Sequence, residues 1–226
     1  MQDLGISVIF EGSNFIRLLG GLWITLRIAI VAVSISIIFG IGLGILMTSK
    51  NKIVRLLTKF YLETVRIIPI LVWLFVFFFT ITKVFQIHLP AEASAILVFS
   101  LWGIAEIGDI VRGTVTSLPK HQWESGMSLG LTTHQIYRYI VLPQIIRRFV
   151  PAAMNLVTRM IKTTSLVVLI GVVEVLKVGQ QIIEVSILKN PMASFWVYAT
   201  IFALYFIICY PISLWSRHLE MKWQGQ

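Results

Sequence analysis

The chain has 226 residues, of which 57% are apolar and 13% are charged. An ordinary soluble domain has about 45–50% apolar and about 25% charged residues, so this composition indicates a protein whose solvent is lipid. The formal net charge of +9 does not point to nucleic acid, because the basic residues lie at the ends of apolar runs rather than on one polar face.

Five apolar runs follow one another along the chain, and a bilayer crossing takes about 20 residues. They predict an all-α membrane protein with a single transmembrane domain over residues 1–226. The expected spans are at about 21–47, 67–84, 93–115, 149–173 and 192–215. Residues 53–65 alternate basic and apolar side chains. We expect them to form an interfacial lead-in to the second span, in the same helix, with Lys and Arg reaching the lipid head groups.

The basic residues between spans predict the topology. They gather in the first–second loop, the third–fourth loop and the C-terminal tail, at Lys50, Lys52, Arg55, Lys59, Lys120, Arg138, Arg147, Arg148, Arg217 and Lys222. Cytoplasmic loops carry an excess of such residues. The N-terminus is therefore expected outside and the C-terminus in the cytoplasm, in a multi-pass protein of the bacterial inner membrane.

Residues 116–148 form the longest polar segment, too polar to cross the membrane and too long for a simple turn. Pro119 and Gly130 punctuate it, and Thr132 or Thr133 is a suitable cap for a second helix. The pattern predicts two short amphipathic helices, at 122–129 and 134–140, that meet at a sharp angle. Such a projection suits a soluble partner that binds a helix in a groove.

At these residues the chain resembles the membrane subunits of bacterial ATP-binding-cassette (ABC) importers. Glu124-Ser125-Gly126, then Gly130, then the Ile140–Pro143 stretch match the spacing of their "EAA" loop. The segments WITLRIAI, YLETVRIIPILV and KTTSLVVLIGVVEV resemble the polar amino-acid permease branch, and the resemblance covers about residues 20–219. Two positions depart from the pattern: Ser125-Gly126 replaces the usual pair of alanines, and Thr163 stands where relatives often have Asp or Asn.

The resemblance implies a type I ABC importer permease fold and translocation of a polar amino acid into the cytoplasm by alternating access. It implies two ATPase subunits, a second permease subunit, identical or homologous, and an extracytoplasmic binding protein. ATP and magnesium would bind to the ATPase, with no cofactor and no catalysis on this chain. Gly130 would allow the turn and Glu124 would lie at the coupling contact. The residues implied in ATPase coupling are Glu124, Ser125, Gly126, Gly130, Leu131, Tyr139, Leu142 and Pro143.

Charged residues interrupt two of the expected spans: Glu106, Asp109 and Arg112 in the third, and Arg159 and Lys162 in the fourth. A charge at bilayer depth costs at least about 2.5–3.5 kcal/mol unless it is paired or hydrated. We expect these residues to face one another or a water-filled cavity. They either line a path for a zwitterionic amino acid or form ion pairs that hold two helices together. The candidate path residues are Glu106, Asp109, Lys162, Thr163, Thr164 and Ser165, and the last three could instead bond to their own backbone.

Pro69, early in the second span, predicts a gating kink without a direct ligand role. Gly40, Gly42 and Gly44 suit close helix packing, and no phosphate-loop pattern accompanies them. No catalytic or metal-ligand spacing links the four histidines and Cys209. The alternative function is an ion-coupled secondary transporter or channel with a proton or cation site at Glu106 or Asp109, although no inverted repeat supports it.

Overall fold

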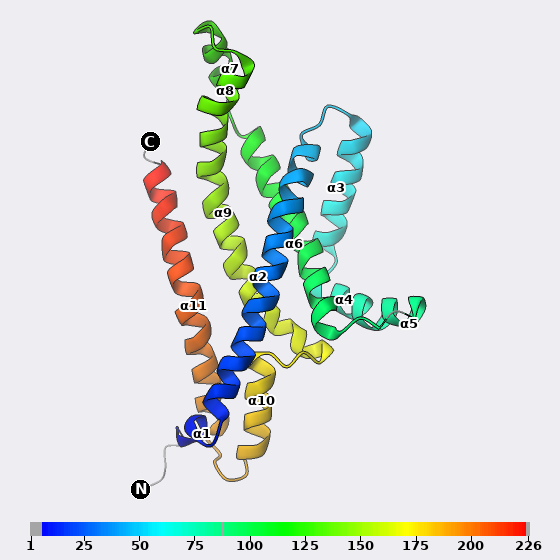
Figure 1. Cartoon of the computed structure of the whole chain (residues 1–226), viewed down its shortest axis with the longest axis vertical. Coiled ribbons are helices and arrows are strands. Elements are labelled where there is room, and N and C mark those ends of the chain that lie inside the picture. Colours follow the sequence, from blue (N-terminus) through cyan, green and yellow to red (C-terminus); the bar gives the residue numbers. More distant parts are fainter. Residues whose placement is uncertain (1–5, 87, 225–226) are drawn as a thin grey trace. The chain divides into compact units, whose positions relative to one another are not determined.

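The computed structural model describes residues 6–86 and 88–224, and these residues form helices and no strand. This confirms the all-α fold class. Figure 1 shows the helices in chain order. Their bounds are α1 Ser7–Phe10, α2 Asn14–Met47, α3 Lys52–Ile67, α4 Ile70–Phe75, η1 Val76–Ile81, α5 Thr82–Phe85, α6 Ala91–Thr116, α7 Lys120–Ser128, α8 Thr133–Ile136, η2 Tyr137–Val141, α9 Leu142–Thr163, η3 Thr164–Ile170, α10 Val175–Ser186 and α11 Ala193–Gln224.

Four helical segments are long and apolar enough to cross a membrane: α2, α6, the continuous run at 133–170, and α11. A fifth crossing is obtained when α3 and the segment from α4 to η1 are counted together as one broken span. The structure therefore has four to five candidate spans, where the apolar runs predict five. Two helix bounds differ from the expected spans: α2 begins at Asn14, and α11 continues to Gln224.

The chain divides into two compact units, which are described separately. Unit 1 comprises residues 1–33, 69–99 and 158–211, and unit 2 comprises residues 34–68, 100–157 and 212–226.

Unit 1 has its core where the first half of α2 meets α10 and the start of α11. Leu18 and Leu22 of α2 are buried with Val178 and Ile182 of α10 and Val197 of α11. The sequence analysis places no element between the fourth and fifth spans, but α10 occupies most of that segment. Its buried positions have the spacing of one helical face, at Val175, Val178, Gly179, Ile182 and Ser186.

Unit 2 is built on close contact between the second half of α2 and α6. A Cβ atom on Gly40 would lie 2.6 Å from the Ile107 Cβ, and one on Gly44 would lie 2.5 Å from the Val111 Cβ. These glycines therefore let the two helices approach, as expected. Gly42 has no atom within 4 Å of its added Cβ and takes no part in this packing.

The segment expected as an interfacial lead-in forms α3, which packs along α6. Leu62 and Val65 of α3 are buried in one cluster with Ala105 of α6, and the Tyr61 hydroxyl donates to the Leu101 carbonyl oxygen at 2.6 Å. The polar stripe of α3 faces a cavity and an ion-pair network instead of bulk water. Alternating basic and apolar residues fit both arrangements, and the contacts with α6 decide between them.

Pro69 divides the expected second span. Ile68 precedes the proline and is extended at φ −80° and ψ 125°, as steric contact with a proline ring requires. Helix α3 ends at Ile67 and α4 begins at Ile70 with Pro69 as its N-cap, so lead-in and span are not one helix. The break at Pro69 is confirmed, whereas a gating role stays a prediction.

Candidate functional site

The α7–α8 hairpin has the local signals of a fixed turn. Gly130 lies between the two helices at φ +75°, a left-handed conformation that favours glycine. Thr132 caps α8 through a capping box: its hydroxyl accepts from the Gln135 backbone N–H at 3.4 Å, and the Gln135 Oε1 accepts from the Thr132 N–H at 2.8 Å. The second helix is not separate, because α8, η2, α9 and η3 run continuously over residues 133–170.

Close packing holds the two arms of the hairpin together. Gly126 is buried, and a Cβ atom there would lie 2.9 Å from the Ile136 Cγ1. The Trp123 and Tyr137 rings meet edge to face at 5.1 Å. Gly126, which departs from the family pattern, therefore occupies the tightest point of this contact.

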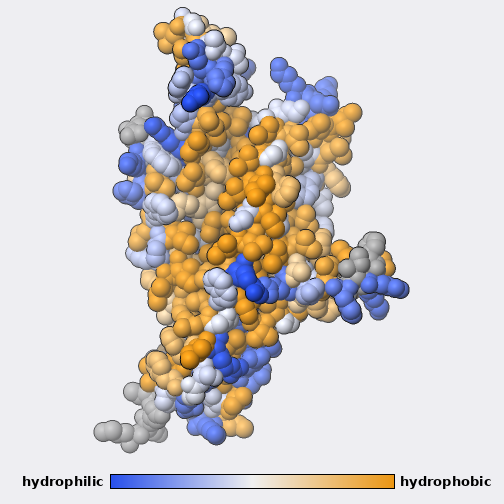
Figure 2. All heavy atoms as spheres, viewed as in Figure 1, coloured by the Kyte–Doolittle hydropathy of each residue, from blue (hydrophilic) through white to orange (hydrophobic). Residues whose placement is uncertain are grey.

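The hairpin leaves large apolar side chains uncovered. Met127, Leu129 and Tyr139 are 55%, 79% and 67% exposed, and Glu124 is exposed beside them. Figure 2 shows hydrophobic and hydrophilic side chains side by side on this projection. Of the other implied coupling residues, Ser125 and Leu142 are exposed, and Leu131 and Pro143 are half-buried. A rigid, exposed apolar surface of this kind suits a protein partner.

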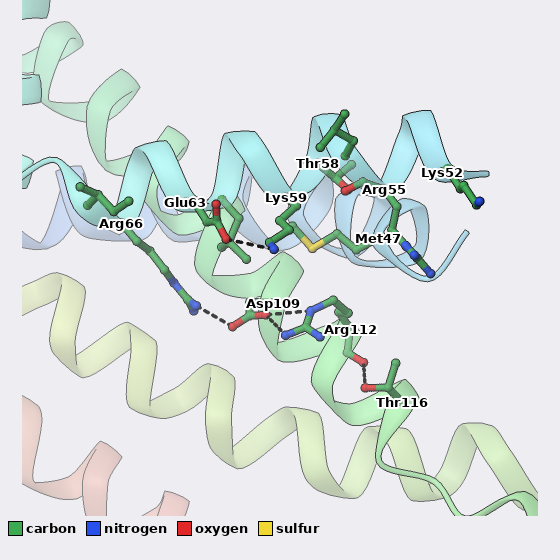
Figure 3. Close-up of a pocket in the computed structure, with 13 residues that line it drawn as sticks. Met47, Lys52, Arg55, Thr58, Lys59, Glu63, Arg66, Asp109, Arg112 and Thr116 are labelled. Atoms are coloured by element: carbon green, nitrogen blue, oxygen red, sulfur yellow. Dashed lines mark hydrogen bonds and ion pairs between the residues drawn. The ribbon is translucent and has the colours of Figure 1, made fainter. Parts of the chain in front are cut away.

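A second polar cluster joins α3 to α6 (Figure 3). The Arg66 Nε donates to the Glu106 Oε1 at 2.9 Å. The Arg66 Nη1 lies 2.7 Å from the Asp109 Oδ2, and this contact is drawn in Figure 3. The Arg112 Nη2 donates to the Asp109 Oδ1 at 2.6 Å. The i,i+3 contact of Asp109 and Arg112 follows from the sequence spacing. Arg66 was not foreseen in this role, because it lies between the expected lead-in at 53–65 and the expected span at 67–84 and was given no role in either.

The other candidate path residues belong to unit 1. Each hydroxyl of Thr163, Thr164 and Ser165 donates to a carbonyl oxygen of its own helix, at 2.8, 2.6 and 2.9 Å respectively. Each of these hydroxyl oxygens can still accept a hydrogen bond from a ligand, but its proton is already donated. Lys162 is exposed, and no ion pair among the described residues includes its ammonium group. The prediction that the α6 carboxylates face the basic residues of α9 stays a prediction.

Glu174 is a buried acid that sequence reasoning missed. Its side chain caps α10 by accepting from the Lys177 backbone N–H at 2.9 Å, and it accepts from the Thr25 hydroxyl at 3.2 Å. The residue is 0% exposed, and this burial raises the pKa of the Glu174 carboxyl above its usual range. The periodic apolar positions of α10 could have located the cap, but nothing in the sequence points to Thr25.

Membrane-spanning helices, a rigid hairpin with an exposed apolar surface, and charged residues within spans together define a subunit of a membrane transport system. The model of the family described as "Binding-protein-dependent transport system inner membrane component" matches residues 40–224. The chain belongs to this family, which confirms the expected resemblance.

Two curated relatives are similar to most of this chain. The L-cystine transport system permease protein TcyB of Bacillus subtilis is 30% identical over 203 residues, covering 90% of this chain and 85% of the relative. The glutamate transport system permease protein GluD of Corynebacterium glutamicum is 32% identical over 187 residues, covering 81% and 67%.

Solved structures agree with the fold. A crystal structure of an amino acid ABC transporter with histidines matches with a TM-score of 0.82 and 25% identity, over 93% of this chain and 95% of that one. An inward-facing MetNI methionine ABC transporter matches with a TM-score of 0.71 and 18% identity, over 92% and 98%. The latter supports the fold alone.

Proposed function

We propose that this chain is the permease subunit of an ABC importer that carries a polar amino acid into the cytoplasm by alternating access. The observation that carries the proposal is the α7–α8 hairpin, whose capped and tightly packed arms present Glu124 beside an exposed apolar surface. The curated relatives named above transport cystine and glutamate, both polar amino acids. The residues of this chain perform no covalent step.

Two ATPase subunits would bind the α7–α8 hairpin of this chain and the corresponding hairpin of a second permease, identical or homologous. ATP and magnesium would be held by the ATPases, and a binding protein would deliver the amino acid from the opposite side. The hairpin and the basic first loop would therefore face the cytoplasm, with the N-terminus outside and the C-terminus inside the cell membrane.

For the substrate path, Lys162 is the best-supported residue. A cation in a membrane-spanning helix with no carboxylate partner is costly, and a ligand carboxylate would offset that cost. Glu106 and Asp109 already pair with arginine side chains. That pairing fits a structural role at the path wall better than an open cation site of an ion-coupled transporter, which needs uncompensated carboxylates.

The test is transport by the chain reconstituted in liposomes with its ATPase, with binding protein and labelled amino acids outside. Uptake should require ATP on the ATPase side. Glu124→Lys should lower it at least about tenfold, the loss that corresponds to about 1.4 kcal/mol at the coupling contact. Lys162→Gln should lower uptake while ATPase retention stays normal.

The matched control is Glu184→Lys, an equal charge reversal at an exposed position of α10. Co-purification of the ATPase should fall with Glu124→Lys and persist with Glu184→Lys. Uptake that ignores ATP and follows a proton or sodium gradient would reject the importer.

A further inference from the structure

Unit 2 contains a cavity of about 720 Å³ that the proposed function does not use (Figure 3). It lies between the end of α2, the polar stripe of α3 and the last turns of α6. Its volume is within the range of about 300–1,000 Å³ that is usual for small-molecule sites. The question is which kind of ligand its walls would bind.

The cavity wall has an excess of positive charge. Its charged lining comprises five basic and two acidic residues: Lys52, Arg55, Lys59, Arg66, Arg112, Glu63 and Asp109. The Asp109 carboxylate is held by two arginines, and the Glu63 Oε1 lies 3.5 Å from the Lys59 Nζ. Among the described residues no ion pair includes Lys52 or Arg55. These two cations lie at one end of the cavity and remain available to an anion.

An apolar stripe on α3 adjoins the charged one. Ile53, Leu57 and Phe60 are 68%, 63% and 69% exposed, and Leu56, which lines the cavity, is 67% exposed. Helix α3 thus has three faces: one packed on α6, one charged and turned to the cavity, and one apolar and uncovered. A ligand that fits both open faces has an anionic head and a hydrocarbon tail.

The cavity lies at the same end of unit 2 as the α7–α8 hairpin. Lys52 and Arg55 occupy the first turn of α3, and Thr116, the last residue of α6, is also part of the wall. Figure 1 shows the start of α3 and the hairpin at one end of this unit. On the proposed topology, on which the leaflet assignment rests, this end faces the cytoplasmic leaflet, where anionic lipids attract basic residues.

We propose that this cavity binds an anionic phospholipid of the cytoplasmic leaflet. The lipid phosphate lies between the Lys52 ammonium and the Arg55 guanidinium, and its acyl chains lie along Ile53, Leu57 and Phe60. Free phosphate would satisfy the two cations but would leave the apolar stripe uncovered. The stripe therefore favours the lipid, which also ties α3 to the membrane next to its ion pairs with α6.

The experiment uses the full chain purified in a neutral detergent, with native mass spectrometry as the readout. Phosphatidylglycerol should be retained more strongly than phosphatidylcholine with the same acyl chains. Lys52→Gln and Arg55→Gln should each weaken retention of phosphatidylglycerol about fivefold, the equivalent of about 1 kcal/mol per basic residue. The charge-preserving pair Lys52→Arg and Arg55→Lys should retain it.

Lys177→Gln with Lys189→Gln is the matched control, since it removes two exposed or half-buried basic residues of unit 1. The proposal is overturned if the control weakens binding equally, or if the two phospholipids bind alike. It is also overturned if inorganic phosphate displaces the lipid while Leu57→Ser has no effect, which would identify a free-phosphate site. Phosphatidylglycerol retention that is unchanged in Lys52→Gln/Arg55→Gln would also overturn it. Because no ATP or amino acid is present, failed lipid binding and failed import are separate results.

Discussion

Three carboxylates with little solvent exposure are held by two different kinds of donor. Glu106 and Asp109 receive charged donors from Arg66, and Asp109 also from Arg112. Glu174 receives a backbone N–H and a hydroxyl, both neutral. Charge-assisted bonds are stronger than neutral ones. The α6 carboxylates therefore have the stronger donors, whereas burial raises the pKa of the Glu174 carboxyl.

Replacing Glu174 by Gln tests whether the raised pKa of Glu174 makes the stability of the fold depend on pH. The pKa of Glu174 in the folded chain lies above the ordinary carboxyl value of 4.5. The folded state then binds more protons than the unfolded state, so stability falls as pH rises through the window above 4.5 up to the raised pKa. Glu174→Gln keeps an acceptor for the Lys177 N–H and should remove this fall. The thermal midpoints of wild type and variant should match at low pH. As the pH rises above 4.5, the midpoint of the variant should become the higher of the two.

Tryptophan fluorescence during heating, at a series of pH values in detergent, measures the difference. Glu184→Gln, at an exposed position of the same helix, serves as the control and should follow the wild type. A Glu174→Gln variant that loses stability relative to the wild type as the pH rises would contradict the raised pKa and would show that the carboxylate is needed in its charged form.

Residue contacts were predictable where they are local and not where they are distant. The Thr132 cap and the Asp109–Arg112 pair follow from spacings of three residues. Arg66 and Glu106 are 40 residues apart, and Thr25 and Glu174 are 149 apart. A single sequence gives the cost of a buried carboxylate but not the distant segment that supplies its donor.

Among the elements, the contact between α2 and α6 depends on two glycines four residues apart. At Gly44 an added Cβ would lie 2.5 Å from the Val111 Cβ and 2.7 Å from the Gly108 carbonyl oxygen. The oxygen belongs to the backbone and cannot rotate away. Small residues at such positions let membrane helices approach closely.

Gly44→Ala should therefore lower the free energy of unfolding by about 1–3 kcal/mol, the usual cost of overpacking. Gly42→Ala is the matched control two residues away, where the new methyl group meets no atom within 4 Å. It should be neutral or slightly stabilising, because alanine is the better helix former. Thermal melts in detergent compare the two variants. Equal effects would show that helix propensity and not the α2–α6 contact sets the stability.

Helix α3 was expected to be part of the second span, and helix α10 was not predicted. Both α3 and α10 carry apolar residues on one face and polar residues on another. This pattern is shared by helices that lie in the interface and by helices packed at the edge of a bundle. The long apolar spans were predictable because an apolar run of about 20 residues is by itself enough to indicate a bilayer crossing. The sequence of an amphipathic helix does not show whether its apolar face contacts lipid or another helix, so its position depends on contacts that the structure supplies.

On the scale of the whole molecule, the packing of α2 on α6 sets the number of crossings. Gly40 meets Ile107 and Gly44 meets Val111, so residue numbers rise in the same direction along both helices. The two helices are therefore parallel, and the chain between Met47 and Ala91 must return to the side where α2 began. We therefore expect the broken segment of α3, α4 and η1 to form one crossing. With α9 and α11 this predicts five spans.

Cysteine accessibility in intact cells tests this count. In a Cys209→Ala background, single cysteines replace Ser13 before α2, Lys50 between α2 and α3, His88 before α6 and Leu188 before α11. With five crossings and the basic loops inside, a membrane-impermeant maleimide should label Ser13→Cys, His88→Cys and Leu188→Cys at once. Lys50→Cys should react only after the membrane is permeabilised.

His88 is the deciding position, because it follows the broken segment. If α3, α4 and η1 together re-cross the bilayer, His88→Cys is labelled with Ser13→Cys; if they do not, it is protected with Lys50→Cys. Protection at His88 would contradict the parallel packing of α2 and α6, since α6 would then start on the side where α2 ends. Labelling at His88 would place the α7–α8 hairpin on the side of the basic first loop, as the proposed binding of an ATPase to the hairpin requires.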